Sequence, residues 1–318
     1  MSEYINDKKR NLKMCIEIAA FWAVIFVLGS FYDDGFARFI YVGYKAGETG
    51  EPSIGMISAV VVSAVGSYIF YGSFVFLLGI LARQIMNSVS NKLYNEFIAL
   101  VYLFFSLFTS TYGAMAIRSN SVCGLLMPNI SNSLMNYVIT GLILFIPLYP
   151  LGIALNGRKC DDNVIDELMI LLSILTVAII FSNVVKGGVM RPRYRVTLQG
   201  YEGIGFVPWY RHIQNGKELI AAYALVRDDF SSFFSGHAMD GMLGIILFPA
   251  FRHVFEKLKG REMQLICLAL IIAVPVTFSR LMLGNHYLSD VAVGGLVGVG
   301  MAAVHFTIVP LFSGKKGQ

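Results

Sequence analysis

Long apolar runs separated by short polar stretches dominate the chain. A helix that crosses a lipid bilayer needs about 20 mostly apolar residues. We therefore predict an all-α, polytopic transmembrane helical bundle with about eight membrane-spanning helices. The predicted spans are Met14–Ser30, Ile57–Ala82, Phe97–Ile117, Leu134–Leu155, Leu168–Val185, Ala238–Val254, Met263–Leu283 and Val291–Phe312. The sixth span is the weakest candidate, because it is short and carries Asp240 near its start.

Most predicted connections are short and polar, and the exception is a long loop over residues 186–235. This loop retains aromatic side chains, including Phe206, Trp209 and Tyr210. Long loops of this kind more often carry a function than serve only as connections between helices. We interpret the three aromatic residues as anchors in the membrane–water interface, where amphipathic rings are favoured. The alternative is that they form the rim of a substrate groove.

The composition agrees with a membrane protein. Charged residues make up 14% of the chain and hydrophobic residues 56%, whereas a soluble domain carries roughly 25% charged residues. The net charge of +5 suits an anionic membrane surface. Because the chain has no basic run, we expect no nucleic-acid partner. The four cysteines are scattered without metal-ligand spacing, and no pattern indicates the oligomeric state.

The placement of lysine and arginine predicts the orientation, because these residues collect in cytoplasmic loops. If the N-terminus is cytoplasmic and the predicted helices alternate, most of these cations fall on the cytoplasmic side, together with both termini. We therefore expect an integral protein of the cytoplasmic (plasma) membrane. Most of the exceptions gather in one outer region, between residues 186 and 227, and at Arg280. An anionic ligand on that side is the simplest reason for such a cluster.

Three polar clusters fall at predicted outer ends of helices, and FSRLMLGNHYLSD, residues 278–290, is the most informative. His286 and Asp290 are four residues apart, which places them on one face if they share a helix. A carboxylate that accepts a proton from one imidazole nitrogen leaves the other nitrogen's lone pair free as a nucleophile or base. Arg280 offers a planar fork of donors that matches phosphate oxygens.

The other two clusters are SSFFSGHA, residues 231–238, and KGGVMRPRYR, residues 186–195. Ser235 and Gly236 precede a predicted helix, so we expect their backbone N–H groups to face an anion at its positive end. His237 is a second imidazole, and Lys186 and Arg193 add cations. This set suits phosphoryl transfer through a phosphohistidine: cations bind the phosphoryl oxygens, one histidine attacks, and the other protonates the leaving oxygen. We expect no metal or other cofactor, because no carboxylate cluster is present to hold one.

The spacing of these residues resembles the motifs of the membrane-bound type 2 phosphatidic acid phosphatase superfamily, the lipid phosphate phosphatases. The third motif of that family is complete here: Ser279-Arg280, five residues, His286, three residues, Asp290. The second motif has Phe234 where the family has proline, followed by Ser235-Gly236-His237.

The first motif departs further from the family pattern. Lys186 is followed by six residues and Arg193, but Tyr194 stands where the family has proline. Arg191-Pro192 lies two residues early, so Arg191 competes with Arg193 as the candidate for the phosphate contact.

The resemblance implies a role for each matched residue. It makes His286 the nucleophile, Asp290 its orienting partner, and His237 the general acid that then activates water. It assigns the phosphate to Lys186, Arg193, Ser235, Gly236 and Arg280. It also implies a six-helix core over residues 97–318, which contains the long outer loop, and leaves residues 1–96 as an N-terminal two-helix extension.

Together these observations lead us to expect an integral membrane phosphatase with an extracytoplasmic site, embedded among membrane lipids and acting on a lipid phosphate or diphosphate. An isoprenoid diphosphate carrier and a glycerophospholipid phosphate both fit as substrates. A phosphotransferase or a phosphatase for soluble substrates on the same scaffold remains an alternative. A transporter of an anionic solute is an alternative of a different class, although such a site usually lies near the middle of the bilayer.

Overall fold

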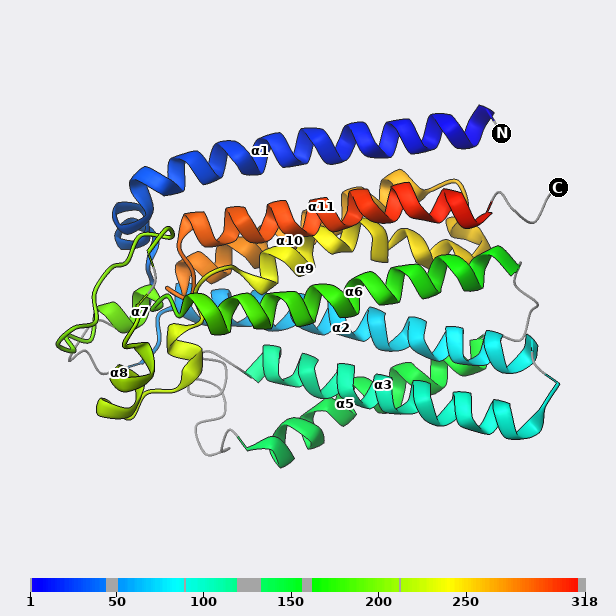
Figure 1. Ribbon diagram of the computed structural model, residues 1–318, viewed down its shortest axis with the longest axis horizontal. Coiled ribbons are helices and arrows are strands. Elements are labelled where there is room, and N and C mark those ends of the chain that lie inside the picture. The colour runs from blue at the N-terminus through cyan, green and yellow to red at the C-terminus, as the bar shows by residue number, and fades with distance from the viewer. Residues whose placement is uncertain are drawn as a thin grey trace. The chain divides into compact units, whose positions relative to one another are not determined.

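The computed structural model describes residues 2–43, 51–88, 90–118, 133–155, 162–211 and 213–313 (Figure 1). Every regular element within these residues is a helix, which confirms the predicted all-α class. The longer helices are α1 Ser2–Ile40, α2 Ile54–Ser88, α3 Lys92–Arg118, α5 Leu134–Leu155, α6 Asp162–Val189, α9 Gly236–Leu247, α10 Glu262–Met282 and α11 Leu288–Ser313. The short ones are α7 Tyr194–Thr197, α8 Gly216–Ala222 and the 3-10 helices η1 Arg227–Phe230, η2 Pro249–His253 and η3 Glu256–Leu258.

Among the described helices, seven are long and apolar enough to cross a membrane: α1, α2, α3, α5, α6, α10 and α11. Large apolar side chains on them face outward, as Phe31, Phe97 and Ile271 do. In water such a surface would favour aggregation, whereas in lipid it needs no partner. These helices confirm an integral membrane protein.

The sixth predicted span is shorter than expected. The helix α9 ends at Leu247, and Pro249 then opens the 3-10 helix η2. Proline removes a backbone donor, and its ring clashes with the carbonyl four residues earlier, so it ends an α-helix at this point.

The first helix is instead longer than its apolar run. It continues past Ser30 to Ile40, through a polar stretch in which Arg38 pairs with Asp34 at 2.8 Å. Oppositely charged residues four apart stabilise a helix. The extension carries a neighbouring carboxylate, Asp33, beyond the predicted span.

The chain divides into two compact units. The second unit comprises residues 64–175, 244–271 and 304–318. Within it, α2 and α5 approach closely at two glycines. A Cβ atom added to Gly79 would lie 2.4 Å from the Tyr149 carbonyl oxygen, and one added to Gly152 would lie 2.3 Å from that of Phe76. Because glycine has no side chain, it lets two helix backbones come into close contact.

The first unit comprises Met1–Ser63, Thr176–Leu243 and Ile272–Ala303, and it contains every residue of the three sequence motifs. Glycines bring its helices together as well. A Cβ on Gly294 of α11 would lie 2.3 Å from the Ser235 carbonyl oxygen, just before α9. One on Gly29 of α1 would lie 2.5 Å from the backbone nitrogen of Ser289 in α11. The third motif therefore lies directly against α1.

We expect Gly29→Ala to lower the thermal unfolding temperature of the detergent-solubilised protein. The added methyl group would overlap the Ser289 backbone, and overpacking of this kind costs roughly 1–3 kcal/mol. Gly35→Ala is the matched control, because Gly35 lies in the same helix and a Cβ there meets no atom within 4 Å. Alanine is also the better helix former, so the control should unfold at the same or a slightly higher temperature. Equal effects of the two substitutions would contradict the close contact between α1 and α11.

Candidate active site

The third motif forms a turn that reverses the chain between two long helices. Arg280 lies in the last turn of α10, and Asp290 lies in the first turn of α11. Gly284 adopts a φ of +61° between them, a left-handed conformation that costs glycine little. The Asn285 N–H then donates to the Arg280 carbonyl at 3.1 Å. The turn therefore brings the arginine of α10 close to His286.

Two carboxylates accept the free N–H groups at the start of α11. Asp290 accepts a hydrogen bond from the Tyr287 N–H at 2.8 Å, which is half of a capping box. Asp33 of α1 accepts one from the Ser289 N–H at 2.8 Å. The first turn of a helix leaves such donors unpaired, so the two aspartates stabilise both the helix start and the position of the motif.

His286 is buried, and its Nδ1 atom lies 2.6 Å from the backbone carbonyl oxygen of Ser232. A carbonyl oxygen can only accept, so Nδ1 carries the proton and the lone pair of Nε2 is free. The sequence led us to expect the Asp290 carboxylate as this partner. Asp290 instead accepts from the Ser232 hydroxyl at 2.5 Å. His286 precedes the start of α11 at Leu288, so the two residues are not four apart on one helix.

Arg193 and Arg280 are both buried close to this imidazole. Arg193 donates to the carbonyl oxygen of Asn285 at 3.0 Å and to the Asp228 carboxylate at 2.6 Å. Arg280 donates to the Ser63 hydroxyl at 2.9 Å. Its Nε is buried and has no hydrogen-bond partner in the described protein. Because buried donors are almost always paired, Nε indicates a place for an anion.

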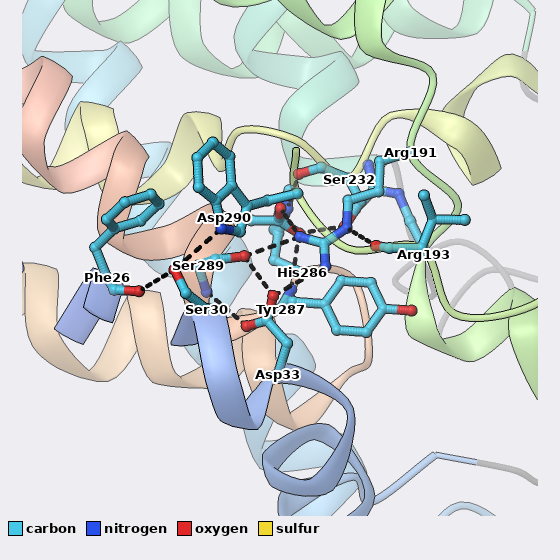
Figure 2. A network of polar contacts seen from close by, with 12 residues as sticks. Phe26, Ser30, Asp33, Arg191, Arg193, Ser232, His286, Tyr287, Ser289 and Asp290 are labelled. Carbon is cyan, nitrogen blue, oxygen red and sulfur yellow. Dashed lines mark hydrogen bonds and ion pairs between the residues drawn. The ribbon is translucent and has the colours of Figure 1, made fainter. Parts of the chain in front are cut away.

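Arg191, the competing candidate, is committed to other partners. It donates to Asp33 at 2.9 Å and to Asp290 at 2.5 Å, and its guanidinium lies over the Tyr287 ring, 4.1 Å from the centroid. Figure 2 shows this network from close by. Arg193, in contrast, acts electrostatically on both motif histidines. Of these two arginines, Arg193 is thus the one whose charge reaches both imidazoles.

The second motif opens α9 and meets Lys186. The Ser235 hydroxyl accepts a hydrogen bond from the Ala238 N–H at 3.4 Å, as an N-cap residue does. The Ser235 N–H donates to the Asp290 carbonyl, so it is not directed at an anion as the sequence led us to expect. A Cβ on Gly236 would lie 3.3 Å from Nζ of Lys186. Glycine at this position thus lets the ammonium approach the start of α9, where His237 lies in the first turn.

Burial and neighbouring cations hold the two imidazoles neutral. Burial lowers the pKa of His286 well below its usual value, and the charges of Arg193, Arg280 and Lys186 lower it further. Burial and the same three cations have this effect on the pKa of His237. An arriving dianion would offset those charges and allow an imidazole to take up a proton.

Asp228 balances part of this positive charge. Burial raises the pKa of its carboxyl, but Arg193, Arg195 and Lys186 together outweigh burial and hold the pKa at about 2. Asp228 is therefore ionised at neutral pH. It forms ion pairs with Arg193 and Arg195.

The aromatic residues of the long loop pack against the same region. The Trp209 ring lies against Phe26 of α1 with centroids 4.8 Å apart, and its Nε1 donates to the Ser30 hydroxyl at 3.0 Å. The Phe206 ring lies 5.7 Å from the Arg191 guanidinium. Tyr210 is largely exposed.

Sequence reasoning missed several polar contacts of the site, among them Asp33, Asp228 and the Ser232 carbonyl. Asp33 and Asp228 had a signal, because both are carboxylates on the predicted outer side, where unexplained cations gather. No sequence signal marks the Ser232 carbonyl, because every residue has a backbone carbonyl. The residues that the structure describes contain no group of three His, Cys, Asp or Glu side chains arranged to hold a metal ion.

The fold and the site define a polytopic helical membrane protein in which two imidazoles and several cations converge, a centre suited to an anionic ligand. Residues 167–313 match the family model of the PAP2 superfamily, which confirms the resemblance seen in the motifs. This part of the chain is a PAP2 superfamily domain, and with the apolar helices it supports a membrane phosphatase of the PAP2 type. Searches of curated proteins and of solved structures found no match.

We expect sulfate to bind more tightly as the pH falls from about 8 to about 6. Sulfate remains a dianion over this range, whereas the imidazoles are neutral in the free site. Binding should raise the pKa of His237, so affinity rises as pH falls through the pKa of the bound form, by up to about tenfold per pH unit. Calorimetry in buffers of different ionisation enthalpy measures the proton uptake. His237→Gln should abolish it, and a pH-independent affinity would contradict this account.

Proposed function

We propose that the chain hydrolyses a lipid phosphate or diphosphate through a phosphohistidine formed on His286. The observation that carries the proposal is the tautomer of His286. Its Nδ1 proton is held by the Ser232 carbonyl, which leaves the Nε2 lone pair free for attack. The nearby cations Lys186, Arg193 and Arg280 suit a phosphoryl group and would stabilise its charge in the transition state.

The proposed reaction has two steps. In the first, Nε2 of His286 bonds to phosphorus, the bond to the leaving oxygen breaks, and protonated His237 donates its proton to that oxygen. In the second, neutral His237 takes a proton from water, the resulting hydroxide attacks phosphorus, and the N–P bond breaks. Phosphate leaves, and both histidines return to their starting states. General acid–base steps of this kind contribute about 10²–10⁴-fold each.

A lipid substrate follows from the predicted position of the site at the outer ends of helices, where lipid headgroups lie. An isoprenoid diphosphate carrier and a glycerophospholipid phosphate both present a phosphoryl group at that level. We favour the first by analogy with outward-facing members of the family. In this proposal residues 97–318 form the phosphatase core, with both chain termini in the cytoplasm, and residues 1–96 are an added segment.

We expect the purified wild-type chain to release phosphate from lipid phosphates or diphosphates, and His286→Ala to abolish release from every substrate. A panel of lipid monophosphates, lipid diphosphates and water-soluble esters measures both the activity and the substrate class. Activity confined to soluble esters would contradict the lipid assignment. A wild-type chain that releases no phosphate would contradict the phosphatase itself and favour a transporter.

The two histidines should respond differently to the leaving group. A lipid alcohol leaves poorly without a proton, whereas a nitrophenolate leaves easily. We therefore expect His237→Ala to lose about 10²–10⁴-fold on a lipid monophosphate and much less on the nitrophenyl ester. The ratio of kcat/KM for the two substrates is the measurement. The reverse pattern, in which His286→Ala retains activity on the activated ester, would mean that His286 is not the nucleophile.

The outward orientation is tested at two cysteines that lie outside the described residues, Cys123 and Cys160. The predicted topology places Cys123 outside the cell and Cys160 in the cytoplasm. In single-cysteine variants, an impermeant thiol reagent should label Cys123 in intact cells and Cys160 only after permeabilisation. Labelling of Cys160 alone in intact cells would overturn the topology.

A further inference from the structure

Asp33 lies in α1, far from the family domain in sequence, yet it is part of a buried network with the third motif. Its Oδ2 atom lies 2.9 Å from NH2 of Arg191, and its Oδ1 accepts the Ser289 N–H at 2.8 Å. The Ser289 hydroxyl also donates to Asp33. Asp33, Arg191, Ser289 and Asp290 are all almost completely buried. Figure 2 shows Asp33 pointing from α1 into this network.

The network leads from Asp33 to the nucleophile through hydrogen bonds. Arg191 is shared between Asp33 and Asp290, which it meets at 2.5 Å. The other oxygen of Asp290 accepts the Ser232 hydroxyl at 2.5 Å, and the Ser232 carbonyl holds Nδ1 of His286. A change at Asp33 therefore alters how Arg191 shares its hydrogen bonds between Asp33 and Asp290. Because Asp290 also holds the Ser232 hydroxyl, the position of Ser232 changes as well.

Backbone contacts hold α1 in place for this role. Gly29, one turn before Asp33, lets the helix meet the Ser289 backbone. Directly after α1, the Val42 N–H donates to the Met282 carbonyl at 3.0 Å, at the end of α10. Asp33 is thus presented to the motif from a helix that is fixed on both sides of it.

We propose that Asp33 is a positioning residue for the nucleophile His286, acting through Arg191, Asp290 and Ser232. This inference rests on the proposed function. It gives α1, which lies outside the matched family range, a part in positioning the nucleophile. Asp33 touches neither His286 nor the reacting atoms, so its effect is on the geometry of attack and not on phosphate binding.

The test compares Asp33→Asn with Asp34→Asn in the full chain. Asp34 is the neighbouring carboxylate, but it pairs with Arg38 on the surface of α1. Two quantities are measured for each: the single-turnover rate of phosphohistidine formation, and the affinity and stoichiometry of sulfate binding. We expect Asp33→Asn to slow phosphohistidine formation by about 10- to 100-fold, as small displacements of reacting groups do. Sulfate should still bind one per chain with unchanged affinity, and Asp34→Asn should match the wild type.

Two results would overturn the role of Asp33. One is a rate for Asp33→Asn within twofold of the wild type. The other is an equal fall in rate and in sulfate stoichiometry, which would mean that the substitution only reduces the folded fraction. If wild-type protein forms no phosphohistidine, the proposed function fails first and this inference with it.

Asp33→Glu keeps the experiment decisive if Asp33→Asn does not fold. Glutamate retains the charge that pairs with Arg191 but moves the carboxylate by one methylene. We expect it to slow phosphohistidine formation by about 3- to 10-fold with full sulfate binding. A wild-type rate in Asp33→Glu would show that the position of this carboxylate does not matter.

Discussion

Arg191 is a buried cation between two buried carboxylates, Asp33 and Asp290, and the geometry of the site depends on this pairing. A charge removed from water must be paired and hydrogen-bonded, and loss of one partner of a buried pair costs roughly 3–5 kcal/mol. The three residues come from α1, from the segment after α6 and from the start of α11. Their pairing therefore holds three distant parts of the chain at one place. The second oxygen of Asp290 accepts the Ser232 hydroxyl, and the Ser232 carbonyl accepts the Nδ1 proton of His286. The same pairing therefore also affects the position of the His286 imidazole.

The cations of the site differ in how far their partners already satisfy them. Arg191 is fully committed, whereas Arg280 has a buried Nε without a partner in the described protein. All three guanidinium nitrogens of Arg193 also donate hydrogen bonds, to the carbonyl and carboxylate of Asp228 and to the Asn285 carbonyl. The Asp228 side chain is 36% exposed and that of Arg193 only 2%. An anion that approached Arg193 would therefore compete with a carboxylate that is partly exposed to water. Carboxylate partners thus hold Arg191 and Arg193 in place.

The sequence predicted the helical class and the chemical groups well, and the contacts among them less well. Lipid requires long apolar helices, so the runs that became α2, α3, α5 and α10 are visible in composition alone. Histidine and arginine at motif spacing are equally visible. Helix ends are less so: α1 continues to Ile40 through polar residues, and α9 ends before Pro249. The partner of His286 could not be predicted, because it is a backbone carbonyl and because Asp290 and His286 do not share a helix.

The departure in the first motif is connected physically with α1, which lies outside the matched family range. The sequence has two arginines, Arg191 and Arg193, where the family pattern has one. Only Arg193 acts on both motif histidines, so Arg191 must be stabilised elsewhere. Asp290 alone would have to neutralise it while also holding Ser232 and the Tyr287 N–H. Asp33 of α1 supplies the second carboxylate, and Gly29 allows α1 to come close enough to deliver it. An arginine that the family pattern does not require is thus accommodated by a helix that the matched family range does not include.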